Sequence, residues 1–146
     1  MGIYLIVNPI AGKGRTKALA EKIEGQLKER KVKDEIVYTE YLGHAIELAV
    51  KVDEKEFSKV VSVGGDGTLN EILNGLNLEE MALGIIPAGT GNDLIRCTNI
   101  PSDEMEALEV VLNGAIKPID VGLINDKRFI NVAGFGLDVE VLRETL

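Results

Sequence analysis

Short apolar runs alternate along the chain with segments in which apolar residues recur at helical spacing. A continuous apolar run occupies residues 3–7, and stretches in which apolar residues predominate occupy residues 35–38, 59–63 and 83–86. Such runs are typical of strands that are buried on both faces. Strands that alternate with helices favour a three-layer α/β/α domain with a mostly parallel sheet.

Four segments carry the spacing of amphipathic helices. They are residues 16–29, a segment through Ala45, Leu48 and Ala49, a segment with Leu69, Ile72, Leu73 and Leu76 on one face, and a segment that ends near Asn113 with Met105, Leu108 and Leu112 inward. Ser102 is the expected N-cap of the last helix, because Asp103 and Glu104 then fall in its first turn, where the helix dipole favours acidic residues. Gly114 is its expected terminator.

The pattern changes after Gly114. Residues 119–124 and 128–133, in which apolar side chains predominate, flank Asn125-Asp126-Lys127, which predicts two strands joined by a hairpin turn. Residues 139–146 have helical spacing, and Leu146 still lies on the apolar face. We therefore expect the chain to be a fragment that ends within a helix.

Three of the predicted strands run directly into glycine-rich turns. These turns are residues 8–15, 64–68 and 89–93. Right-handed crossovers place the turns at the carboxyl ends of parallel strands along one edge of the sheet. Turns of this kind that lead into helix N-termini present backbone N–H groups without side-chain obstruction, which suits a phosphate group. The three turns together predict a phosphate-binding surface.

Two familiar phosphate motifs do not fit these turns. A P-loop would require glycine at position 7 and serine or threonine after Lys13, but Val7 and Gly14 stand there. A dinucleotide fingerprint requires a third glycine or alanine three residues after Gly-x-Gly, and none of the Gly-x-Gly sites has one.

Acidic residues in and beyond the turns indicate a cation. A carboxylate such as Asp66 or Asp93 beside a phosphate repels it unless a cation lies between them, and Mg²⁺ is the oxygen-seeking ion of nucleotide sites. Asp120 lies in an apolar strand pattern, where an unpaired carboxylate would be costly. A purely structural role stays open for each of the three: Asp66 as a turn-former, Asp93 as a helix cap, and Asp120 as the partner of a lysine or arginine.

Composition narrows the functional classes. The chain of 146 residues has 16 Lys and Arg against 24 Asp and Glu, a formal net charge of −8. This balance argues against a nucleic-acid partner and against electrostatic adsorption to anionic lipid. No apolar run approaches the ~20 residues that span a bilayer, and no basic segment precedes the first apolar run, which favours the cytoplasm. Cys97 is the single cysteine, so disulfides within the chain are excluded.

In and around the three glycine-rich turns, the sequence resembles the diacylglycerol kinase catalytic family. This family includes bacterial diacylglycerol kinases and related sphingosine and ceramide kinases. The most specific element is residues 64–76, Gly-Gly-Asp-Gly-Thr-Leu-Asn-Glu-Ile-Leu-Asn-Gly-Leu. Its first part is shared with NAD kinases. Three further elements distinguish lipid kinases: Asn8-Pro9-x-x-Gly12, Thr39 with Gly43-His44-Ala45, and residues 87–94.

The resemblance implies roles for individual residues. The nucleotide pocket would be lined by Asn8, Pro9, Gly12 and Thr39. The ATP phosphates would be wrapped by Gly65, Asp66, Gly67, Thr68, Leu69, Asn70 and Glu71, and Thr90 would be a further nucleotide contact. Asp66 would be the catalytic residue and act through Mg²⁺, while Asp93 and Asp120 would belong to the acidic network that holds the metal. His44 is not expected to be catalytic, because in the family the turn that contains Gly43-His44-Ala45 is associated with nucleotide binding and not with proton transfer.

The implied activity is an ATP- and Mg²⁺-dependent lipid kinase, with residues 1–124 as the nucleotide-binding domain. Residues 125–146 would begin the connection to a second, β-rich domain that holds the lipid and is missing from this chain, so the fragment alone is expected to be inactive. Membrane contact would be peripheral at most, at the inner face of the membrane. An NAD kinase-like phosphotransferase and a non-catalytic nucleotide-binding or homodimerising fragment remain as alternatives.

Overall fold

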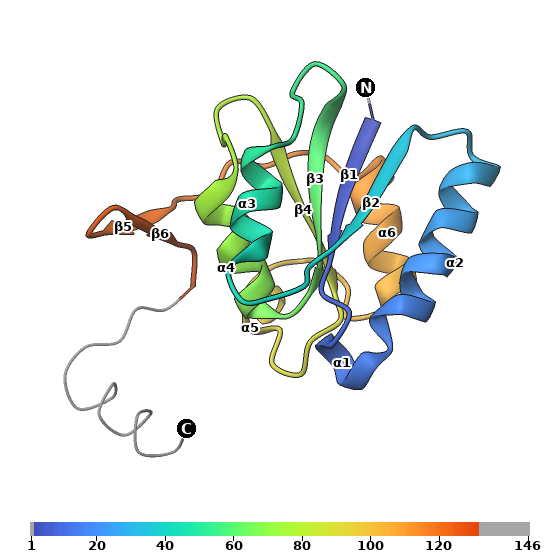
Figure 1. The fold of residues 1–146 in the computed structure, drawn as a ribbon, viewed down its shortest axis with the longest axis horizontal. Coiled ribbons are helices and arrows are strands. Elements are labelled where there is room, and N and C mark those ends of the chain that lie inside the picture. The colour runs from blue at the N-terminus through green and yellow to red at the C-terminus, as the bar shows by residue number, and fades with distance from the viewer. Residues whose placement is uncertain (1, 132–146) are drawn as a thin grey trace.

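The computed structural model describes residues 2–131 of the chain. Its elements follow the predicted alternation closely (Figure 1): β1 Gly2–Val7, α1 Ala11–Gly14, α2 Thr16–Glu29, β2 Asp34–Tyr38, α3 His44–Val50, β3 Phe57–Gly64, α4 Asp66–Gly75, β4 Ala82–Pro87, α5 Asp93–Arg96, α6 Glu104–Asn113, β5 Gly122–Ile124 and β6 Lys127–Phe129. No helix among the described residues is long and apolar enough to cross a membrane.

Four parallel strands form the central sheet in the order β2-β1-β3-β4. All six residues of β1 are buried, as expected for a strand flanked on both sides and covered on both faces. The chain moves outward from β1 to β2 and then returns to β3 on the other side of β1. The carboxyl ends of β1 and β3 therefore flank a topological switch point, where α/β sheets bind ligands.

Helices cover both faces of the sheet, which confirms the three-layer α/β/α prediction (Figure 1). On one face, Ala20 and Ile23 of α2 and Leu108 of α6 pack against alternate strand residues such as Leu5 and Val61. On the other face, Ala45 and Ala49 of α3 and Ile72 of α4 pack against Tyr4, Ile6 and Val60. Each large apolar side chain that is fully buried contributes roughly 1.5–3 kcal/mol to folding.

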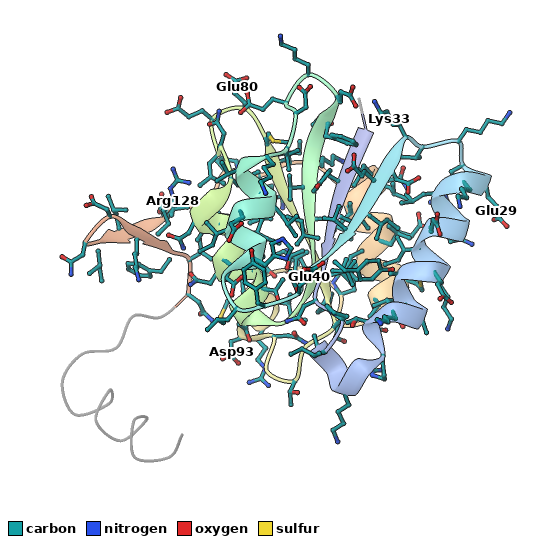
Figure 2. The ribbon with its side chains drawn as sticks, viewed as in Figure 1. Glu29, Lys33, Glu40, Glu80, Asp93 and Arg128 are labelled. Carbon is teal, nitrogen blue, oxygen red and sulfur yellow. The ribbon has the colours of Figure 1, made fainter. Side chains whose placement is uncertain are left out.

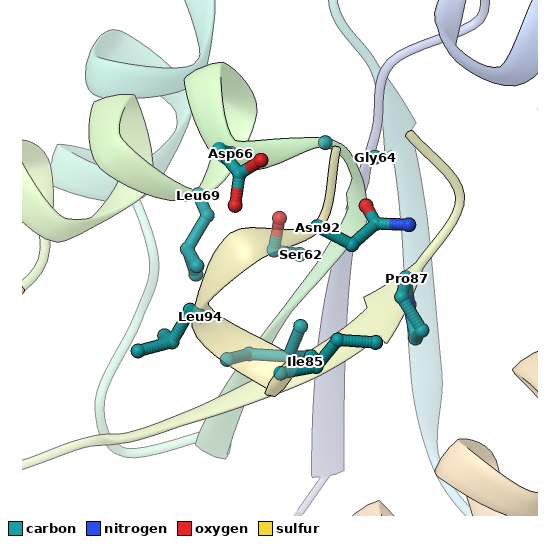
Figure 3. Close-up of a pocket in the computed structure, with 10 residues that line it drawn as sticks. Ser62, Gly64, Asp66, Leu69, Ile85, Pro87, Asn92 and Leu94 are labelled. Atoms are coloured by element: carbon teal, nitrogen blue, oxygen red, sulfur yellow. The ribbon is translucent and has the colours of Figure 1, made fainter. Parts of the chain in front are cut away.

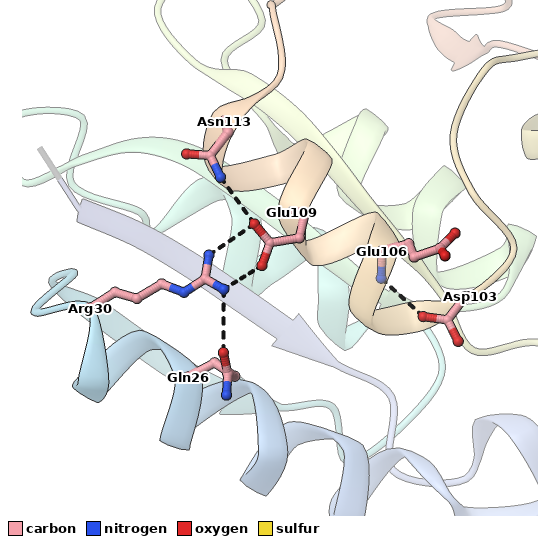
Figure 4. A network of polar contacts seen from close by, with 6 residues as sticks. All are labelled: Gln26, Arg30, Asp103, Glu106, Glu109 and Asn113. Atoms are coloured by element: carbon pink, nitrogen blue, oxygen red, sulfur yellow. Dashed lines mark hydrogen bonds and ion pairs between the residues drawn. The ribbon is translucent and has the colours of Figure 1, made fainter.

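An ion pair ties the two helices of the first face together (Figure 4). Arg30, which follows α2, forms a bidentate pair with Glu109 of α6, and Gln26 and Asn113 complete the network. The hydrogen bond from Arg30 lowers the pKa of the Glu109 carboxyl. Both side chains are partly exposed, so the pair adds little to the stability that burial of α2 and α6 provides.

Two local predictions are wrong. The N-cap of α6 is Asp103, whose side chain accepts hydrogen bonds from the Met105 and Glu106 N–H groups, and not Ser102. The strand predicted over residues 119–124 contains only Gly122–Ile124, and Ile119 and Asp120 lie exposed outside it. Residues 119–121 pair with no strand in the described part of the chain, so β5 does not extend there.

The predicted hairpin forms as a separate two-stranded sheet, β5–β6. Asn125 and Asp126 make its turn, and both have positive φ, as a two-residue hairpin turn requires. Lys127, predicted in the turn, begins β6. The second strand was predicted over residues 128–133, but β6 ends at Phe129, and residues 130 and 131 lie outside it. Residues 132 and 133 and the helix predicted over 139–146 lie outside the described residues.

Candidate nucleotide site

The three glycine-rich turns lie at the carboxyl ends of β1, β3 and β4, on one edge of the sheet (Figure 1). The first contains the single turn α1, where Gly12 and Lys13 adopt left-handed backbone angles. The second enters α4 at Asp66, and the third enters the short helix α5 at Asp93. The predicted arrangement of the turns at one edge is therefore present.

Side chains join the first turn to the second at the switch point. The Asn8 side chain donates a hydrogen bond to the Thr68 hydroxyl oxygen at 3.1 Å, and the Asn8 backbone N–H donates to the Val63 carbonyl at 3.0 Å. The buried Thr16 hydroxyl donates to the Asn8 carbonyl at 2.6 Å, which anchors the beginning of α2 to the same turn. Asn8 is therefore fixed through both its backbone and its side chain.

The second and third turns pack backbone against backbone. The Gly64 carbonyl accepts hydrogen bonds from the Ala88 and Gly89 N–H groups at 2.8 and 3.1 Å. A Cβ atom on Gly89 would overlap the Gly65 backbone, and one on Gly12 would overlap the Ala88 carbonyl oxygen. The three turns thus converge, and glycine at these positions permits their close approach.

Asp66 connects the second turn to the third. Its Oδ1 atom accepts a hydrogen bond from the Asp93 N–H at 2.9 Å. A Cβ atom on Gly91 would lie 3.0 Å from Asp66 Oδ2 and 3.8 Å from Asp93 Oδ1, so the two carboxylates flank Gly91. The Asp93 carboxylate also lies 3.3 Å from Arg96 in an exposed ion pair.

A small cavity lies beneath Asp66, between β3, β4 and α5 (Figure 3). Its volume is about 10 Å³, and its lining is largely apolar, including Leu69, Ile85 and Leu94. A cavity of this size holds at most one water molecule. This cavity is therefore too small to receive a nucleotide.

Comparisons with known proteins show the family of the chain. Residues 2–124 match the family model of the diacylglycerol kinase catalytic domain. The chain belongs to this family. A diacylglycerol kinase of Staphylococcus saprophyticus is 35% identical over 143 residues, which cover 97% of this chain and 47% of the relative. One of Bacillus subtilis is 35% identical over 135 residues, covering 90% of this chain and 45% of the relative.

The fold agrees with this family. A crystal structure of a diacylglycerol kinase from Bacillus anthracis superposes with a TM-score of 0.77 at 34% identity, covering 88% of this chain and 45% of that chain. The present chain spans about half the length of the curated relatives that it matches.

At the edge formed by the three turns, the structure brings together most of the predicted residues. Asn8, Gly12, Gly65, Asp66 and Thr68 lie at the converging turns. Pro9 is half-buried beside Asn8, and Gly67 is exposed in the first turn of α4. Thr39 follows β2, and its N–H donates to the Val7 carbonyl at 2.9 Å, which places it next to the end of β1.

The remaining predicted residues differ in exposure and in the contacts that they make. Thr90 and Asn70 are exposed, and Leu69 is buried and lines the small cavity. The Glu71 carboxylate accepts hydrogen bonds from the Gly43 and Ala45 N–H groups at the beginning of α3.

Asp120 does not join the other two aspartates. In residues 2–131, no three or more acidic, histidine or cysteine side chains are grouped closely enough to hold a metal ion. The desolvation argument for Asp120 is wrong, because this residue is exposed outside any strand.

Asn92 is a site residue that the sequence analysis did not single out. Its side-chain oxygen accepts from the Gly89 N–H at 3.2 Å, and its amide donates to the Gly89 carbonyl at 2.9 Å, so it closes the third turn on itself. Its φ of 51° is left-handed, a conformation that asparagine tolerates. Its place after Gly-x-Gly and before a helix was the signal that could have found it.

Proposed function

We propose that the chain is the nucleotide-binding part of a lipid kinase that transfers the γ-phosphoryl group of ATP to the hydroxyl of a diacylglycerol-like lipid. The observation that carries this proposal is the convergence of three glycine-rich turns at the switch point, joined by the Asn8–Thr68 and Asp66–Asp93 hydrogen bonds. Family membership and the names of the relatives support the kinase class.

The chemistry expected at this edge is positioning and charge stabilisation. Backbone N–H groups of the turns and the N-terminus of α4 favour an anionic phosphate chain. Asn8, Thr39 and Thr90 would contact the nucleotide around this cradle.

The donor set fits Mg²⁺ that arrives with the nucleotide. Asp66 Oδ1 is engaged by a backbone N–H, which leaves Oδ2 for a cation, and Asp93 offers a second, exposed carboxylate nearby. Mg²⁺ in kinase sites keeps several waters and binds one or two carboxylates plus substrate phosphates, so a protein cage is not required. The ion would neutralise charge on the phosphates.

The lipid is expected to bind a second, β-rich domain beyond the nucleotide-binding residues 1–124. Residues 125–146 would begin the connection to it. Cytoplasmic location, peripheral membrane contact and the homodimer stay predictions.

A pair of substitutions at Asp66 tests the proposal. Asp66→Asn keeps an oxygen that can accept the Asp93 N–H but removes the charge, whereas Asp66→Ala removes both. We expect Asp66→Asn to weaken Mg²⁺-dependent ATP binding at least tenfold with a nearly unchanged melting temperature, and Asp66→Ala to lower the melting temperature as well. Calorimetry with and without Mg²⁺ and thermal melting measure these effects.

Two results would contradict the proposal. The first is a wild-type chain that gives no heat of binding with ATP and Mg²⁺. The second is an Asp66→Asn variant that loses stability as severely as Asp66→Ala, because Asp66 would then serve only as a turn-former.

A further inference from the structure

Glu71 fastens the beginning of α3 to α4. Its Oε1 atom accepts the Gly43 N–H at 3.0 Å, and its Oε2 atom accepts the Ala45 N–H at 3.2 Å. These N–H groups lie at the helix N-terminus, where backbone donors lack partners within the helix. The negative charge of the carboxylate also suits the positive end of the α3 dipole.

A second contact on the same face of α4 holds α3 one turn further along. Gly75 lies four residues after Glu71, so both residues face the same side of the helix. A Cβ atom on Gly75 would overlap the Ile46 carbonyl oxygen and lie 3.0 Å from the Ala49 Cβ atom. Helix α3 is therefore fixed at its N-terminus by Glu71 and along its length by close backbone packing.

The turn before α3 is the segment that Glu71 holds in place. It runs from Thr39, which is bonded to the end of β1, to Ala45. Within it, the Glu40 N–H donates to His44 Nδ1 at 3.1 Å, and the Tyr41 ring stacks on His44 with 4.5 Å between ring centroids. Gly43 has a φ of 88°, the left-handed conformation that lets the chain enter α3.

The two ends of this arrangement carry different parts of the candidate site. The first turn of α4 contains Asp66 and Thr68, at the converging turns. The 39–45 turn contains Thr39, which is expected to contact the nucleotide beyond its phosphates. Both Glu71 oxygens are already engaged by backbone donors, and a carboxylate repels phosphate directly. These facts argue against Glu71 as a phosphate ligand.

We infer that Glu71 is a positioning residue that fixes the 39–45 turn relative to the phosphate-binding end of α4. This inference rests on the proposed function, because it assumes that a nucleotide contacts both segments. It replaces the expected direct contact between Glu71 and ATP. It also explains why glutamate, and not merely a helix-former, suits position 71.

The experiment compares two ligands in the whole chain. Inorganic tripolyphosphate with Mg²⁺ probes the phosphate-binding turns, and ATP with Mg²⁺ probes these turns together with the 39–45 turn. We expect Glu71→Ala to weaken ATP binding tenfold or more and tripolyphosphate binding less than twofold. Glu71→Gln, which keeps one acceptor oxygen, should restore most of the ATP affinity.

Amide hydrogen exchange in the absence of ligand provides a second readout. Glu71→Ala should expose the Gly43 and Ala45 amides to faster exchange, while core amides of β1 keep their protection. Glu80→Gln is the matched control, because Glu80 is exposed and lies at the opposite end of the molecule from Asp93 (Figure 2). It should change neither affinity nor exchange.

Each outcome bears on a different claim. Equal loss of ATP and tripolyphosphate binding in Glu71→Ala would overturn the inference, as would unchanged ATP binding or unchanged exchange at Gly43 and Ala45. A wild-type chain that bound neither ligand would contradict the proposed function instead. The exchange measurement would then still decide whether Glu71 fastens α3.

Discussion

Single glycines in the second and third turns serve two different purposes. Gly89 and Gly65 are required by close packing, because their backbones touch where the two turns meet. Gly67, in contrast, has no atom within 4 Å of the position where its Cβ atom would lie. The sequence predicted glycine-rich turns but could not separate these purposes, since both look alike until the turns are placed in space.

Alanine substitutions at Gly89 and Gly67 should have opposite effects on the stability of the fold. Gly89→Ala forces the third turn away from the second and should destabilise the fold by about 1–3 kcal/mol, as overpacking does. Gly67→Ala should leave stability unchanged or raise it by up to ~1 kcal/mol, because alanine is the better helix former. It should nevertheless weaken ATP binding tenfold, since a methyl group blocks the approach of a phosphate. Thermal melting and calorimetry of both variants check this, and wild-type ATP affinity in Gly67→Ala would show that no phosphate approaches there.

Helices and strands were predictable where apolar residues recur at regular spacing over many positions. Residues 16–29 were predicted as a helix and form α2 with the same bounds, because four buried positions repeat along one face. The N-cap of α6 was not predicted correctly, because Ser102 and Asp103 are both good caps. Only the path of the backbone decides which side chain reaches the Met105 and Glu106 N–H groups (Figure 4 shows the contact with Glu106). A strand of three residues such as β5 is too short for the alternation of apolar and polar residues to show where it begins and ends.

The packing of α3 on α4 depends on Gly75, whose role cannot be recognised from the spacing of apolar residues in the sequence. Gly75→Ala should push Ile46 and the rest of α3 outward and destabilise the fold by about 1–3 kcal/mol. Gly25→Ala is the control, because Gly25 is exposed in α2 with no atom within 4 Å of its Cβ position, and alanine there should stabilise by up to ~1 kcal/mol. Urea unfolding of the two variants measures the difference. Equal effects of the two substitutions would contradict the close packing.

For the molecule as a whole, the pattern predicted the layers but not how the hairpin attaches to them. The side chain of Asn74 pairs with the backbone of Arg128 in β6, donating to its carbonyl at 2.9 Å and accepting its N–H at 2.8 Å. The Arg128 guanidinium donates to the Leu73 and Leu76 carbonyls at 3.1 and 2.8 Å, at the C-terminal end of α4 (Figure 2 shows Arg128 between the hairpin and the helices). These contacts join residues more than fifty positions apart, which local periodicity cannot reveal.

Helix α4 therefore has the converging glycine-rich turns at one end and the hairpin at the other. An isolated two-stranded hairpin is marginally stable in water, so β5–β6 depends on this attachment. Asn74→Ala removes both bonds to the Arg128 backbone and should weaken the attachment by about 1–2 kcal/mol. The hairpin should then open more often and expose Lys127 to trypsin, with a roughly tenfold faster cleavage there. Cleavage after Lys31, in the exposed turn after α2, provides the internal reference.

Asn77→Ala is the matched substitution for this test, because Asn77 lies just beyond α4. Its side chain donates to exposed Glu54 and accepts the Glu79 N–H, and neither partner belongs to the hairpin. It should leave cleavage after Lys127 at the wild-type rate. ATP affinity of Asn74→Ala should stay within twofold of wild type, since the turns at the other end of α4 do not depend on the hairpin. Equal cleavage of both variants would mean that Asn74 does not hold the hairpin. Loss of ATP affinity in Asn74→Ala would mean that α4 transmits the state of the hairpin to the nucleotide site.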